Sequence, residues 1–143
     1  MRSRVLIAKP GLDGHDRGAR LMATLLRDAG HEVIYTVIRS TPRAIANAAV
    51  AEDVDLVGLS VLAGGHLGLL RRTLDELAEL GADDIPVIVG GVIPDDDISL
   101  LVAAGAAGVY PSSVPPALIV ERVQDLLRSR PGQATEESAD APY

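Results

Sequence analysis

Short apolar runs alternate along the chain with longer segments in which apolar residues recur every three or four positions. The apolar runs predict five strands at residues 5–8, 33–37, 56–60, 87–89 and 108–110. The periodic segments predict helices over residues 17–29, 42–53 and 67–81, and two more that begin near residues 95 and 115. Thr41 and Pro42 form an expected helix start, with a capping hydroxyl before a proline.

This alternation of strand and helix predicts an α/β fold, with a parallel sheet covered by helices on both faces and right-handed crossovers. The third strand is almost entirely apolar, as in sheets covered on both sides. In the common strand order 2-1-3-4-5, the chain reverses direction between the first and third strands, and ligands bind at that point. We therefore expect a ligand site where the connections after these two strands meet.

The connection after the first strand, residues 9–18, holds a lysine, two acids, a histidine and three glycines. Asp13 and His15 are two positions apart, so their side chains can point the same way. A carboxylate that accepts one ring N–H leaves the other imidazole nitrogen for a metal. Lys9, the only lysine beside twelve arginines, can keep Asp13 ionised. The same residue types also occur in ordinary turns, so spacing alone leaves both interpretations open.

Composition narrows the class of protein. The chain has 143 residues, which suits one domain, and no cysteine, which excludes disulfides and thiolate metal sites. A net charge of −7 argues against general affinity for nucleic acids or anionic membranes. No apolar run approaches a membrane span, so we expect a cytoplasmic protein. We expect one folded domain over residues 1–130 and a disordered tail over 131–143, where the composition turns polar.

Several kinds of site fit the sequence poorly. Gly11, Gly14 and Gly18 do not have the spacing of a dinucleotide loop. A flavin site lacks its hydroxyl-rich phosphate loop and flanking aromatic residues, and a receiver domain lacks its acceptor aspartate and its lysine. A structural zinc site lacks ligands. The remaining possibility is a single histidine that binds a metal ion whose other coordination positions are filled by a cofactor. We expect His31 to be exposed, and we leave open whether His66 faces a cofactor.

Three motifs resemble the cobalamin-binding domains of the methylmalonyl-CoA mutase family. Residues 13–18 (DGHDRG) match the pattern D-x-H-x-x-G, residues 60–62 match S-x-L, and Gly90 with Gly91 match the paired glycines. The order and spacing of these motifs are those of the family, and the similarity extends over residues 4–130. The resemblance implies a flavodoxin-like (Rossmann-like) fold and adenosylcobalamin as cofactor.

The resemblance also implies roles for individual residues. His15 would replace the benzimidazole of cobalamin as lower axial ligand of cobalt, Asp13 would orient His15, and Lys9 would support Asp13. Gly18 would leave room for the freed nucleotide tail. The implied cofactor contacts are Asp13, Gly14, His15, Asp16, Arg17, Gly18, Ser60, Leu62, Gly64, Gly90, Gly91, Tyr110 and Ser112. In one departure from the family pattern, residues 111–114 (PSSV) replace a Thr-Pro-Gly-Thr-like turn and lack its glycine.

In this family, cleavage of the cobalt–carbon bond starts a radical rearrangement of an acyl-CoA carbon skeleton. The barrel that binds acyl-CoA has several hundred residues, so the resemblance implies a small subunit that works with a separate large (β/α)₈ barrel subunit, as a heterotetramer. The sequence leaves the acyl-CoA substrate open. Two alternatives are a stand-alone cobalamin carrier or sensor, and an interaction module that has lost its cofactor.

Overall fold

A five-stranded parallel sheet forms the centre of the protein. The computed structural model describes residues 3–9, 17–35, 41–61 and 65–129. The strands are β1 (Arg4–Ala8), β2 (Glu32–Tyr35), β3 (Leu56–Val61), β4 (Val87–Gly91) and β5 (Gly108–Pro111). They lie in the order β2-β1-β3-β4-β5, and all neighbours are parallel. The predicted fold class and strand order are therefore confirmed.

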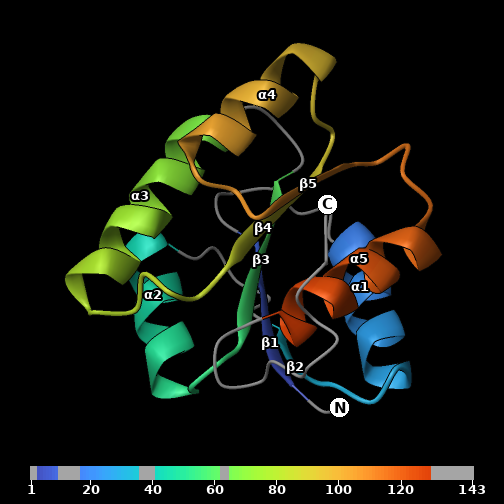
Figure 1. Cartoon of the computed structure of the whole chain (residues 1–143), viewed down its shortest axis with the longest axis horizontal. Helices are drawn as coiled ribbons and strands as arrows, with labels where there is room; N and C mark the ends of the chain where they lie inside the picture. The colour runs from blue at the N-terminus through green and yellow to red at the C-terminus, as the bar shows by residue number, and fades with distance from the viewer. Residues whose placement is uncertain (1–2, 10–16, 36–40, 62–64, 130–143) are drawn as a thin grey trace.

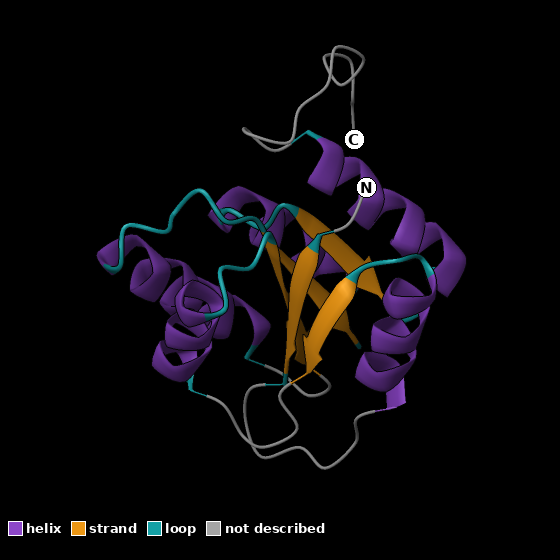
Figure 2. Cartoon of the chain, turned by 90° about the horizontal axis from the view of Figure 1, so that it is seen from below, coloured by secondary structure: helices purple, strands orange, loops and turns teal. Residues whose placement is uncertain are grey.

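Five helices cover the two faces of this sheet. They are α1 (Arg17–Asp28), α2 (Pro42–Ala51), α3 (His66–Glu79), α4 (Asp95–Ala104) and α5 (Pro116–Arg128). Helices α1 and α5 lie side by side on one face, and α2, α3 and α4 lie on the other (Figures 1 and 2). No helix within the described ranges combines the length and apolar character needed to cross a membrane.

Local sequence signals account for several helix ends. Thr41 caps α2 as predicted, because its Oγ1 accepts a hydrogen bond of 3.1 Å from the amide of Ala44. Three aspartates, residues 95–97, occupy the first turn of α4, where the helix dipole favours negative charge. Helix α3 begins at His66, one residue before the predicted start.

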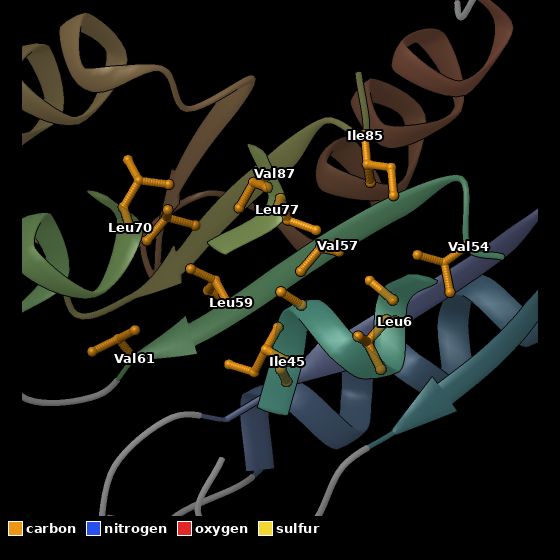
Figure 3. Packing of buried hydrophobic residues seen from close by; sticks show 14 of the residues in the cluster. Leu6, Ile45, Val54, Val57, Leu59, Val61, Leu70, Leu77, Ile85 and Val87 are labelled. Atoms are coloured by element: carbon orange, nitrogen blue, oxygen red, sulfur yellow. The ribbon is translucent and has the colours of Figure 1, made fainter. Parts of the chain in front are cut away.

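The core is aliphatic and divided between the two faces. The larger cluster packs between the sheet and helices α2 to α4, and Figure 3 shows Leu6, Ile45 and Val57 within it. The smaller cluster lies beneath α1 and α5 and includes Leu26 and Val123. Each fully buried side chain of this size contributes about 1.5–3 kcal/mol to folding. This core fixes the carboxyl ends of β1, β3, β4 and β5 relative to one another. The expected disordered tail at residues 131–143 lies outside the described residues.

Candidate functional site

A cavity of about 230 Å³ lies between the sheet and the helices α1 and α5. It opens over the carboxyl-terminal halves of β3, β4 and β5, at the edge where α/β proteins bind ligands. Its lining residues are Ile7, Gly18, Ala19, Leu21, Met22, Leu26, Gly58, Leu59, Ser60, Ile88, Gly90, Gly91, Tyr110, Pro111, Ser112, Val114, Pro116 and Ile119. Within the described part of the chain, no charged side chain lines it.

The register of the strands explains why the sheet is hollow here. In one row across the sheet, Ile7 pairs with Gly58, Gly58 with Ile88, and Ile88 with Gly108. Isoleucine side chains therefore alternate along this row with glycines, which have no side chain. The next row toward the carboxyl edge places Ser60 beside Gly90, and Gly90 beside Tyr110. Because Ser60 is small and Gly90 has no side chain, the floor of the cavity is low at this point.

The glycines around the cavity differ in what a side chain would meet. A Cβ on Gly18 would have no atom of the described residues within 4 Å, and one on Gly90 would lie 3.5 Å from the Tyr110 carbonyl oxygen, an ordinary contact. A Cβ on Gly91 would lie 1.9 Å from the Val61 carbonyl oxygen, and Gly91 has a φ of +137°. Gly91 is therefore required for close strand approach and backbone conformation, whereas Gly18 and Gly90 keep space open.

The structure brings together the described members of the predicted cofactor contacts. Those that line the cavity are Gly18, Ser60, Gly90, Gly91, Tyr110 and Ser112. They come from α1, β3, β4 and β5 and from the turn after β5. Ser112 belongs to the turn that departs from the family pattern, and its amide donates a hydrogen bond of 2.9 Å to the Gly91 carbonyl oxygen.

Other predicted site residues lie outside the described residues. These are Asp13, Gly14, His15, Asp16, Leu62 and Gly64, together with the side chain of Arg17. Lys9 directly follows β1 and is only 5% exposed, but it does not line the cavity. The described ranges contain no group of three or more histidine, cysteine, aspartate or glutamate residues able to hold a metal ion.

The other two histidines are both buried. His66 does not line the cavity, and its Nε2 lies 3.2 Å from the Val61 carbonyl oxygen. Because a carbonyl oxygen only accepts, His66 donates from Nε2 and ties the start of α3 to the end of β3. His31 was expected to be exposed, and that prediction is wrong. It is 4% exposed, and its Nδ1 accepts a hydrogen bond of 3.2 Å from the Ser3 amide.

Sequence reasoning missed the apolar wall of the cavity. Leu21 and Met22 of α1 and Ile119 of α5 lie in segments whose periodicity predicted these helices, and all three line the cavity. Helical periodicity shows which side chains of a helix face the sheet, but not whether they pack against it or leave a cavity in between. Leu21 is 44% exposed, as expected for a side chain above open space.

Comparisons with known proteins find similar sequences over most of the chain. A family model described as B12 binding domain matches residues 3–114. The chain is 43% identical over 127 residues to the 2-hydroxyisobutanoyl-CoA mutase small subunit of Aquincola tertiaricarbonis, covering 89% of this chain and 93% of that protein. It is 40% identical over 138 residues to the pivalyl-CoA mutase small subunit of Xanthobacter autotrophicus, covering 96% and 93%.

Similarity also extends to one part of longer proteins. The chain is 45% identical over 126 residues to the probable methylmalonyl-CoA mutase large subunit of Mycobacterium bovis, which is 88% of this chain but 16% of that protein. Among solved structures, a novel cobalamin-binding protein from Desulfitobacterium hafniense superposes with a TM-score of 0.75 and 26% identity, covering 87% of this chain and 59% of that one.

Proposed function

The chain belongs to the B12-binding domain family, and we propose that it is the cobalamin-binding small subunit of an acyl-CoA mutase. Two relatives named as small subunits of such mutases each match it over 93% of their own length. The proposed activity is an isomerisation that requires a separate large subunit. Adenosylcobalamin, when bound, supplies the radical chemistry of this reaction, and the protein supplies binding and orientation.

The observation that supports this proposal most is the convergence of six predicted contacts on one cavity. The cavity is mostly apolar and uncharged along its described lining, and the lining residues with polar side chains are Ser60, Tyr110 and Ser112. Such a lining suits a flat, neutral aromatic group that carries a few hydrogen-bonding atoms. The nucleotide base of cobalamin is a group of this kind, so the residues present fit the proposed cofactor.

The proposed axial ligand of cobalt is His15. This assignment rests on the D-x-H-x-x-G motif at residues 13–18. In the proposed arrangement Asp13 accepts the ring N–H that faces away from cobalt, and Lys9 stabilises the Asp13 carboxylate. This partner fixes the tautomer of His15 and raises the basicity of its ligating nitrogen. Gly18, with no atom of the described part of the chain within 4 Å of an added Cβ, leaves room for the nucleotide tail in this arrangement.

The proposed partner is a large (β/α)₈ barrel subunit that holds the acyl-CoA substrate. Two large and two small subunits are proposed to form a heterotetramer in the cytoplasm. Similarity to part of a mutase large subunit supports the idea that this fold works beside a substrate domain, whether joined to it or separate. The runner-up function, a cobalamin carrier or sensor, requires the same cavity but no barrel partner.

The test of cofactor binding is a titration of the purified chain with cobalamin, followed by absorption spectroscopy. We expect the absorption spectrum of cobalamin whose own benzimidazole base is not bound to cobalt. With the histidine nitrogens isotopically labelled, electron spin resonance of the Co(II) form should show coupling to one imidazole. His15→Ala should remove this coupling, whereas His31→Gln, before β2 at the opposite edge of the sheet, should keep it. Absence of binding, or persistence of the coupling in His15→Ala, would refute the proposal.

A second experiment separates the mutase subunit from the carrier. The chain is mixed with the large subunit of an acyl-CoA mutase that has been stripped of its own small subunit. Recovery of cobalamin-dependent isomerase turnover, together with co-elution of the two chains, supports the mutase assignment. Tight cobalamin binding without turnover and without co-elution favours the carrier.

A further inference from the structure

Tyr110 separates two cavities. The first is the proposed cofactor cavity under α1 and α5, and the second, of about 560 Å³, lies at the edge of the sheet beside β5. The second cavity is lined by parts of α4, β5 and α5, including Arg122 and Asp125. Among the residues that the structure describes, Tyr110 alone lines both. Its side chain therefore determines where the cofactor cavity ends.

Gly108 provides the space in which the Tyr110 ring lies. The two residues are two positions apart on β5 and so face the same side of the sheet. A Cβ on Gly108 would lie 2.7 Å from Cζ and 3.0 Å from Cε2 of Tyr110, and closer still to its hydroxyl oxygen. Gly108 does not have a positive φ, so the backbone itself would accept alanine. The obstacle to a side chain at position 108 is the ring.

A ring displaced from Gly108 has open space on the cofactor side. Across the sheet from Tyr110 lies Gly90, and beyond it Ser60, so nothing large fills the adjoining floor. That cavity is apolar, whereas the second cavity carries the charged groups of Arg122 and Asp125. Burial of aromatic surface favours the apolar side. Because the obstructed atoms are at the far end of a side chain, the ring moves rather than the strand.

We infer that Gly108 is a positioning residue for the cofactor site. Because Gly108 has no side chain, the Tyr110 ring can lie over it along β5, and the cofactor cavity stays long enough for its ligand. Gly108 itself does not line the cofactor cavity. This inference rests on the proposed function, because it takes the base of cobalamin as the group that the cavity accepts.

The test is a double-mutant cycle of cobalamin affinity with Gly108→Ala and Tyr110→Leu. Gly108→Ala alone should weaken binding by about tenfold or more. In the Tyr110→Leu background the same replacement should change affinity by less than about twofold, because no ring remains to be displaced. An equal effect in both backgrounds, or no effect of Gly108→Ala alone, overturns the inference. Failure of the unmodified chain to bind cobalamin overturns the proposed function instead.

Two further measurements separate ring displacement from general damage. Gly68→Ala on α3 is the matched control, because Gly68 lines neither cavity and has space for a Cβ; it should bind cobalamin normally. The chain has no tryptophan, so the near-ultraviolet circular dichroism reports tyrosine, and Gly108→Ala should change it. If Gly108→Ala melts too easily for titration, adding Tyr110→Leu must restore the melting temperature. Failure to restore it would show that the ring is not the obstacle.

Discussion

Gly18 and Gly68 form a natural pair for testing the cavity at the scale of one residue. Both lie in helices, both have space for a Cβ, and only Gly18 lines the cavity. Replacing either glycine by leucine should not disfavour the helix, because glycine is the poorer helix former. Gly18→Leu should nevertheless weaken cobalamin binding by about tenfold or more, since its side chain competes for the cavity.

Binding titrations of the two variants check this prediction. Gly68→Leu should retain the affinity of the unmodified chain, and thermal melts should show that both variants remain folded. Equal affinities for Gly18→Leu and Gly68→Leu would mean that the tail of the cofactor does not pass beside α1.

Gly90 and Gly91 look alike in the sequence but have different roles in the structure. Gly91→Ala places a Cβ against the Val61 backbone at a φ of +137°, and neither strand can move without breaking its ladder. We expect it to lower the free energy of unfolding by about 2 kcal/mol or more. Gly90→Ala, which meets only an ordinary contact, should lower it by less than about 1 kcal/mol. Urea denaturation of both variants measures the difference, and similar losses would contradict this division of roles.

At the scale of elements, the alternation of apolar runs with helical segments predicted the parallel α/β fold, and the common strand order of such sheets predicted the order. Strands β1, β3 and β4 are largely buried, whereas β2 and β5 at the sheet edges are only partly buried. The ends of the elements were less predictable. Gly90 and Gly91 were expected to end a strand, yet β4 continues through both, because they pair with Ser60 and Val61 of β3. That pairing joins residues about thirty positions apart, so the residues near Gly90 and Gly91 in the sequence do not predict it.

His31 shows the same limit for a side chain. It sits in a short connection between α1 and β2, a position that normally predicts exposure. Its burial comes from Ser3, which precedes β1 and donates its amide to Nδ1 from 28 positions away. The neutral ring therefore carries its proton on Nε2, which has no hydrogen-bond partner among the described residues. The contact ties the start of β1 to the start of β2.

Stability should depend on pH through His31. Burial lowers the pKa of His31 below 6.5, the positive N-terminus lowers it further, and Asp55 acts in the opposite direction. A lowered pKa means that the unfolded chain takes up the proton first, so the contribution of His31 to stability is complete above about pH 6.5 and falls as the pH decreases below it.

His31→Gln should remove this part of the pH dependence, because its amide oxygen can accept from Ser3 without titrating. The measurement is the melting temperature of both proteins at several values between about pH 7.5 and 5. The two curves should converge as the pH falls. If they run parallel, protonation of His31 does not govern the stability of this edge.

At the scale of the whole molecule, the two ends of the sheet have separate tasks. The amino edge holds structural contacts such as the Ser3–His31 hydrogen bond, and the carboxyl edge holds the cavity, which the core residues Ile88 and Leu26 also line. Several lining residues of the cavity, Gly18, Ser60, Gly90 and Gly91, could be selected from the sequence because they belong to the three motifs. The depth of the cavity could not be predicted from the sequence, because it depends on how far helices α1 and α5 lie from the sheet.

A ligand that fills this cavity should stabilise the whole fold. At a free concentration one hundred times its Kd, cobalamin should add about 2.7 kcal/mol to the free energy of unfolding. For a domain of this size that corresponds to a rise of about 5–10 °C in Tm. Thermal melts with and without cobalamin measure it, at one fixed concentration for all variants. Gly68→Leu should gain as much as the unmodified chain and Gly18→Leu much less, because only the latter obstructs the cavity. Equal gains would place the stabilising contacts elsewhere on the carboxyl edge and remove the cavity from the binding site.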